Sequence, residues 1–207
     1  MTLANSDRDQ IAADVALQRL IDGNKKFVRG ELHFPSSQHE VLVESFRGQN
    51  PYATILGCSD SRVPPELIFG AGLGELFVVR VAGNLLSPEI AGTLQYGAVH
   101  VRTPLLVVLG HEGCGAIKAA MQTMRQGFRQ KSQIQILVDR LLPALTHVDP
   151  SLDFDTQLAH AVEANVRWTM AQILESPEGQ GRLEEGHMKL AGAIYELGTG
   201  RVRFLES

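Results

Sequence analysis

The chain holds two cysteines, Cys58 and Cys114, and a histidine, His111, three residues before the second cysteine. Two thiolates and one imidazole suit zinc in a tetrahedral site, because soft sulfur and imidazole are ligands that this ion prefers. Three protein ligands leave the fourth position open, which is typical of catalytic rather than structural zinc. These residues therefore predict one zinc ion per chain with room for a reacting molecule.

The charge of this ligand set indicates how the metal would act. Zinc with two thiolates and a neutral histidine carries no net charge, and thiolates donate electron density to the ion. Bound water should then be less acidic than on zinc held by three histidines, where its pKa is about 7. We expect attack by zinc-bound hydroxide and an activity that favours alkaline pH.

Asp60 and Arg62 follow Cys58 at intervals of two residues. In an extended chain, Asp60 lies on the same side as Cys58. Its carboxylate could accept a hydrogen bond from the hydroxide and orient its lone pair, or bind zinc directly and close the site. Arg62 is the natural partner to hold Asp60 off the metal through a charge-assisted fork.

The three expected ligands follow short apolar runs that are typical of buried strands. Cys58 comes after the run Tyr52–Gly57, and His111 comes after the run Leu105–Leu109. A third run covers Leu76–Val81. Ligand sites in open parallel sheets form at the carboxyl ends of strands, so the cysteines meet if their strands are neighbours.

Helical segments alternate with these strands, at Pro88–Val101 and at Ala116–Met124. The alternation predicts an α/β fold with a mainly parallel sheet and helices on both faces. Met188–Glu196 and Val202–Leu205 resemble the arms of a hairpin, which adds an antiparallel strand at the C-terminal edge.

Apolar residues at helical spacing predict further helices. These are expected at about Ala12–Arg29, Glu40–Arg47, Gln133–Leu145 and Thr156–Leu174. Gly30 is expected to end the first of them, and Pro143 to end the third a turn early. Ser132 and Asp155 are the expected N-caps of the third and fourth helices.

Composition limits the class of protein. The 207 residues suit one domain, without a linker that would divide it. A net charge of −4 argues against a nucleic-acid surface. We expect no signal peptide and no membrane helix, because no apolar run has the required length. The scarcity of cysteine favours a reducing, cytoplasmic compartment.

Three segments match a known family. CSDSRVPPELIF, ELFVVRVAGN and GHEGCGAIKAA resemble the β-class carbonic anhydrases, through the pattern Cys-x-Asp-x-Arg combined with His-x-x-Cys. The likeness runs from about Gln49 to Lys118, and returns in the hairpin around Gly192 to Phe204. It implies a zinc enzyme that hydrates carbon dioxide reversibly to bicarbonate and a proton.

The resemblance also implies an obligate homodimer, often paired into a homotetramer, in which residues 1–48 form a helical arm on the partner. Gln49 would contact the substrate across the dimer interface. Phe77 and Tyr96 would line an apolar pocket for carbon dioxide, and Gly115 would belong to the substrate pocket. Asp60 and Arg62 would be the catalytic pair.

In one respect the chain departs from part of the family. Some members close their sites at low pH through a bicarbonate pocket of Trp, Arg and Tyr. Arg80 and Tyr195 match two of those positions, whereas Ile55 stands where the Trp would be. We therefore expect a permanently open zinc site.

Other functions remain open from the residues alone. A related zinc enzyme could hydrolyse carbon disulfide or carbonyl sulfide, and a catalytically silent zinc scaffold could use the same ligands. A metal-free hydrolase could use Cys114 as nucleophile and His111 as base, although Cys58, Asp60 and Arg62 would then have no role. A redox switch could join the two cysteines when zinc is absent.

Overall fold

A five-stranded sheet organises the computed structural model, which describes residues 11–32, 46, 48–131, 133–176 and 188–206. The strands are β1 (Ala53–Gly57), β2 (Leu76–Arg80), β3 (Leu105–His111), β4 (Lys189–Tyr195) and β5 (Val202–Phe204). Their order is β2-β1-β3-β4-β5. All neighbouring pairs are parallel except β4 and β5, which are antiparallel. The predicted α/β class, with its antiparallel edge strand, is confirmed.

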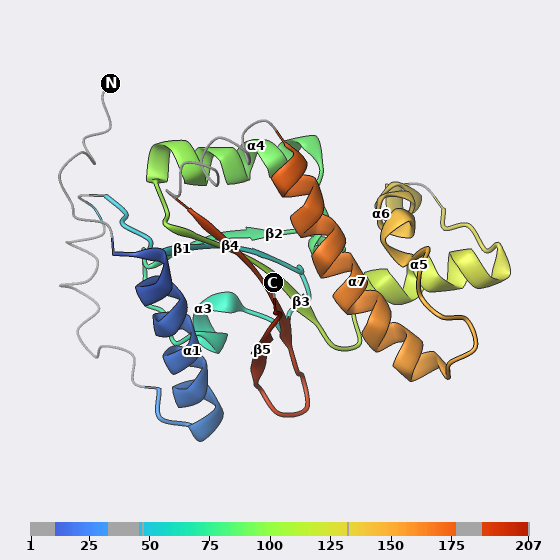
Figure 1. Ribbon diagram of the computed structural model, residues 1–207, viewed down its shortest axis with the longest axis horizontal. Helices are drawn as coiled ribbons and strands as arrows, with labels where there is room; N and C mark the ends of the chain where they lie inside the picture. Colours follow the sequence, from blue (N-terminus) through green and yellow to red (C-terminus); the bar gives the residue numbers. More distant parts are fainter. Residues whose placement is uncertain (1–10, 33–45, 47, 132, 177–187, 207) are drawn as a thin grey trace.

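Helices cover both faces of this sheet (Figure 1). One face carries α4 (Pro88–Tyr96), α5 (Gly115–Gln126), α6 (Gln133–Leu141) and α7 (Phe154–Glu175). The opposite face carries α1 (Ala13–Arg29) and α3 (Pro65–Ile68). Shorter turns complete the described chain: 3-10 turns at Ala82–Asn84 and Leu142–Leu145, and a π-helical turn at Gly97–Val101.

Side chains of β3 alternate between two hydrophobic cores. Leu106 and Val108 join the core under α4 to α7, which we call the first core. Leu105, Val107 and Leu109 join the second core, under α1 and α3. Because each face of the strand is covered, every residue of β3 is buried, which explains a continuous apolar run in place of alternation.

One of two predicted helix ends differs from its expected position. The N-cap of α7 is Asp153 and not Asp155, so that prediction is wrong. The Asp153 carboxylate accepts hydrogen bonds from the backbone N–H groups of Asp155 and Thr156, at 3.1 and 3.0 Å. The earlier start brings Phe154 into the helix and against the first core. Pro143 lies in the 3-10 turn that follows α6, as expected.

Some predicted elements lie outside the described residues. The expected cap Ser132 is one of them, and so is most of the predicted helix at residues 40–47. Of residues 1–48, only 11–32, 46 and 48 are described, so an arm that packs on a partner stays a prediction. Within the described residues, no helix combines the length and apolar character needed to cross a bilayer.

Helix α1 packs against its own chain through Ala16, Leu20 and Asn24. The Asn24 amide donates hydrogen bonds to the carbonyl oxygens of Ile68 and Gly200, at 3.2 and 2.9 Å. Its oxygen accepts a hydrogen bond from the Val202 N–H group at 2.8 Å. This buried amide therefore joins α1, α3 and the C-terminal hairpin.

Replacing Asn24 with alanine should lower the free energy of unfolding by about 2–4 kcal/mol, because buried main-chain groups lose their partners. Urea denaturation measures the change. Gln18→Ala, on the exposed side of the same helix, is the control and should change stability by less than about 0.5 kcal/mol. Equal effects of the two variants would contradict a role for Asn24 in joining these elements.

Candidate metal centre

The carboxyl ends of β1 and β3 bring three buried side chains together. Cys58 directly follows β1, His111 is the last residue of β3, and Cys114 precedes the first residue of α5. Their ligand atoms all lie within 4.8 Å of one another, and the two sulfur atoms are 4.0 Å apart. The expected convergence of Cys58, His111 and Cys114 is therefore present in the structure.

The histidine ring has one satisfied nitrogen and one that is not. His111 Nδ1 lies 2.8 Å from the main-chain carbonyl oxygen of Glu112, so this nitrogen carries the proton of the neutral ring. Nε2 is buried and has no hydrogen-bond partner among the described residues. A buried lone pair without a partner is costly, and a metal ion would satisfy it. Together with the two sulfurs, this atom fits zinc.

Each cysteine sulfur shifts the pKa of the other. The hydrogen bond with Cys114 lowers the pKa of Cys58 to about 4, and the N–H group of Gly83, 3.4 Å from Cys58 Sγ, adds to this effect. The hydrogen bond with Cys58, together with burial, raises the pKa of Cys114. The N–H groups of Ile117 and Ala116, at the start of α5, lower the pKa of Cys114, but the neighbouring sulfur and burial outweigh them. A divalent cation would supply the charge that two adjacent thiolates need.

Asp60 and Arg62 form the expected fork. Arg62 Nε donates to Asp60 Oδ1 at 2.9 Å, and Nη2 donates to Oδ2 at 2.7 Å. The Arg62 backbone N–H donates to Oδ1 at 3.0 Å. These hydrogen bonds hold the pKa of Asp60 well below its usual range, and Asp60 Oδ2 lies 4.0 Å from His111 Nε2. An ionised carboxylate therefore stands beside the cluster with both oxygens engaged.

Arg80, the last residue of β2, has a positioning role that sequence reasoning missed. Its guanidinium donates to the carbonyl oxygens of Cys58 and Asp60, at 2.8 and 2.6 Å. Ile55 and Tyr195, the other two positions compared with the family's bicarbonate pocket, lie in the second core, whereas Cys58 belongs to the first. Arg80 thus holds the segment that carries one expected ligand, Cys58, and the expected catalytic carboxylate of Asp60.

The expected pocket residues are spread more widely. Phe77 and Tyr96 lie near each other, with ring centroids 6.2 Å apart. Phe77 pairs with Thr54 near the start of the strands, four residues before Cys58, which is about 13 Å of extended chain. Gly115 begins α5 beside the cluster, and Gln49 is exposed. One chain therefore does not bring Phe77 and Tyr96 to the cluster.

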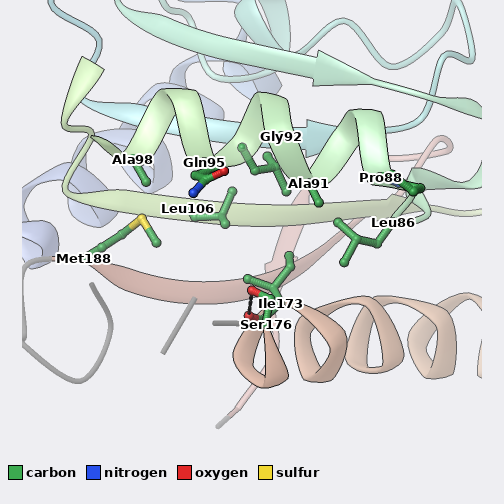
Figure 2. A pocket seen from close by; sticks show the side chains of 11 residues that line it. Leu86, Pro88, Ala91, Gly92, Gln95, Ala98, Leu106, Ile173, Ser176 and Met188 are labelled. Atoms are coloured by element: carbon green, nitrogen blue, oxygen red, sulfur yellow. Dashed lines mark hydrogen bonds between the residues drawn. The ribbon is translucent and has the colours of Figure 1, made fainter. Parts of the chain in front are cut away.

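A separate cavity of about 220 Å³ lies between α4, β3 and the end of α7 (Figure 2). Figure 2 shows Leu106 of β3 and Ile173 of α7 turned towards it, opposite Ala91 and Gln95 of α4. None of the expected site residues lines this cavity. It is therefore distinct from the cysteine–histidine cluster.

Comparison with known proteins identifies close resemblances over nearly the whole chain. The family model described as carbonic anhydrase matches residues 53–202. "Carbonic anhydrase 2" of Mycobacterium tuberculosis is 34% identical over 194 residues, which cover 90% of this chain and 89% of that protein. The carbonic anhydrase of Mycolicibacterium smegmatis is 33% identical, with 90% of each chain covered.

Solved structures agree with these relatives. The β-carbonic anhydrase of Coccomyxa in complex with acetazolamide has a TM-score of 0.75 at 26% identity, with 91% of this chain and 86% of that chain covered. A structure from Sordaria macrospora, reported among tetrameric β-carbonic anhydrases, has a TM-score of 0.75 at 21% identity. It covers 93% of this chain and 98% of that chain, and supports the fold.

Gly83 lies at φ +75°, and a Cβ atom there would lie 3.1 Å from Leu141 and 3.2 Å from Ala116. Gly83→Ala should destabilise the protein by about 1–2 kcal/mol through the backbone and about 1–3 kcal/mol through crowding. It should also weaken zinc binding by moving the N–H group away from Cys58. Denaturation and a competing chelator measure the two effects.

Gly127→Ala is the matched control, because Gly127 has a similar φ of +66° with nothing within 4 Å of a built Cβ atom. Gly127→Ala should lower the free energy of unfolding only by the cost of a positive φ, about 1–2 kcal/mol, and should leave the zinc affinity unchanged. If both alanine variants behave alike, Gly83 is not constrained by its surroundings at the cluster.

Proposed function

The chain belongs to the β-class carbonic anhydrase family of lyases, and on that premise we propose that it hydrates carbon dioxide reversibly to bicarbonate and a proton, using one zinc ion held by Cys58, His111 and Cys114. The observation that carries the proposal is the buried cluster of two sulfurs and an unpartnered His111 Nε2. The family match at residues 53–202 includes all three side chains.

Zinc bound at such a site would lower the pKa of water and so supply hydroxide as the nucleophile, with the alkaline preference expected for two thiolate ligands. Asp60 would accept a hydrogen bond from the attacking water and orient its lone pair towards carbon dioxide. Arg62 keeps the carboxylate ionised and turns both of its oxygens into the fork. That arrangement favours a fourth metal position that remains open to substrate.

The substrate pocket would be completed by a second copy of the chain. Tyr96 is 42% exposed although it is a large aromatic residue, and it lies beside Phe77 away from its own cluster. In a homodimer or homotetramer, Gln49, Phe77 and Tyr96 would serve the neighbouring site, whereas Gly115 would serve its own. A single catalytic domain in the cytoplasm, without nucleic-acid or membrane partners, agrees with the composition.

Stopped-flow hydration of carbon dioxide, with zinc analysis on the same samples, tests the proposal. We expect about one zinc per chain in the wild type and a rate that rises between about pH 6 and about pH 9. Cys58→Ser should lose most of the zinc and nearly all of the activity, because a serine hydroxyl is a poor zinc ligand at these pH values. Wild-type protein that holds zinc without hydrating carbon dioxide at any pH would point to a silent scaffold. A preference for carbon disulfide or carbonyl sulfide would instead identify the related hydrolase.

Asp60→Asn tests the carboxylate. We expect hydration to slow by about 10–100-fold with zinc content unchanged, because the amide cannot accept the two guanidinium hydrogen bonds or orient water in the same way. The control is Asp139→Asn. Asp139 is likewise a carboxylate paired with an arginine, Arg129 at 3.2 Å, but it lies on the surface of α6. An unchanged rate in Asp60→Asn would remove this residue from the mechanism.

A further inference from the structure

Helix α7 packs closely on β3, which carries the expected ligand His111, and on the neighbouring strand β4. A Cβ atom on Gly110 of β3, one residue before His111, would lie 2.7 Å from a methyl group of Val166. A Cβ atom on Gly192 of β4 would lie 3.0 Å from the other methyl group of Val166. The two glycines therefore let the helix approach the sheet directly beside one expected ligand.

Two polar side chains interrupt the apolar face of α7 at this contact. Asn165 is 1% exposed and Thr169, one turn later, is fully buried. Burial of an amide and a hydroxyl is unfavourable unless hydrogen bonds compensate for it. The hydrogen-bond partners of Asn165 and Thr169 therefore indicate why polar residues occupy positions where leucine or valine would pack without a desolvation penalty.

Both side chains bind the same 3-10 turn, Ala82–Asn84. Asn165 Nδ2 donates to the carbonyl oxygen of Gly83 at 2.8 Å, and Thr169 Oγ1 donates to that of Asn84 at 3.4 Å. Gly83 and Asn84 have φ values of +75° and +40°. A positive φ is unfavourable for a residue with a side chain, so surrounding contacts must hold the turn in this conformation.

Gly83 takes part in two contacts through its two adjoining peptide groups: its carbonyl oxygen accepts from Asn165, and its N–H group, in the preceding peptide group, faces the candidate metal centre. The N–H group of Gly83 donates to Cys58 Sγ at 3.4 Å. A chain of hydrogen bonds thus runs from Asn165, through the main chain of Gly83, to the sulfur of an expected ligand. Such outer contacts orient a ligand and withdraw charge from it, which changes metal affinity.

We propose that Asn165, supported by Thr169, is a positioning residue for the metal centre: by fixing the Ala82–Asn84 turn, it keeps the Gly83 N–H group on the Cys58 sulfur. This inference rests on the proposed function in so far as the cluster binds zinc. Asn165 touches neither substrate nor metal, and acts only through the turn.

The experiment compares four variants of the full-length protein with the wild type: Asn165→Leu, Thr169→Val, Thr169→Ser and Ile173→Ala. The readouts are the zinc dissociation constant, measured against a competing chelator, and the thiolate-to-cobalt charge-transfer band of cobalt-substituted protein. Ile173→Ala is the control, since Ile173 lies one turn after Thr169 on the same buried face and lines the separate cavity.

Asn165→Leu should raise the zinc dissociation constant by about 10–100-fold and shift the charge-transfer band. Thr169→Val should act in the same direction with a smaller change, and Thr169→Ser, which keeps the hydroxyl, should restore wild-type values. Ile173→Ala should lower the thermal midpoint while leaving both metal readouts unchanged.

Metal readouts for Asn165→Leu that match the wild type or Ile173→Ala would overturn the proposal. If Asn165→Leu does not fold, the Thr169 pair decides, and equal behaviour of valine and serine refutes the role of the turn. Wild-type protein that binds no zinc refutes this inference and the proposed function together. Wild-type protein that binds zinc without hydration refutes the proposed function alone, because the affinity comparison still tests Asn165.

Discussion

The parallel pairing of β1 with β3 is the constraint on which the candidate metal centre depends. Gly57 lies opposite Leu109 in this pairing, so Cys58 and His111 leave the sheet at the same edge. Side chains alternate between the two faces of a strand, and a slip of one residue would turn Cys58 towards the second core. Close packing of these strands in both cores opposes such a slip, because every side chain would change core, and packing away from the cluster thereby sets the geometry of the expected ligands.

Burial gives the cluster its electrostatic character. Cys58, His111 and Cys114 are 5%, 0% and 1% exposed, so water cannot solvate a thiolate pair at this position. The fold therefore places the Cys58 thiolate, a second sulfur whose pKa is raised and an unpartnered nitrogen lone pair together, and a cation would compensate for all three. Metal binding and folding should be linked in such a site, because the unfolded chain offers no preformed cluster.

Much of this arrangement could be predicted from sequence, since the strands, the ligands and the Asp60–Arg62 fork depend on short segments. The rest depends on tertiary contacts. Asp153 and Asp155 are both suitable cap residues. The structure selects Asp153, whose carboxylate also accepts a hydrogen bond from the Thr156 hydroxyl and whose position lets Phe154 pack against the first core. Asn165 left a weak signal, as an amide between Val162 and Val166 on a buried helix face, but its partner is 82 residues away in the chain. The proposed pocket residues Gln49, Phe77 and Tyr96 would need a second chain, which a single sequence cannot position.

The contact between His111 and Glu112 has a consequence for sequence variation. The Nδ1 proton is directed to a main-chain carbonyl, which every amino acid at position 112 would provide. The Glu112 side chain makes a separate contact, since its Oε2 accepts a hydrogen bond from the Leu197 N–H group at 2.9 Å. The imidazole tautomer thus depends on the peptide backbone and not on any side chain. A substitution at position 112 would change the contact with Leu197 but not the protonation of the neighbouring ring.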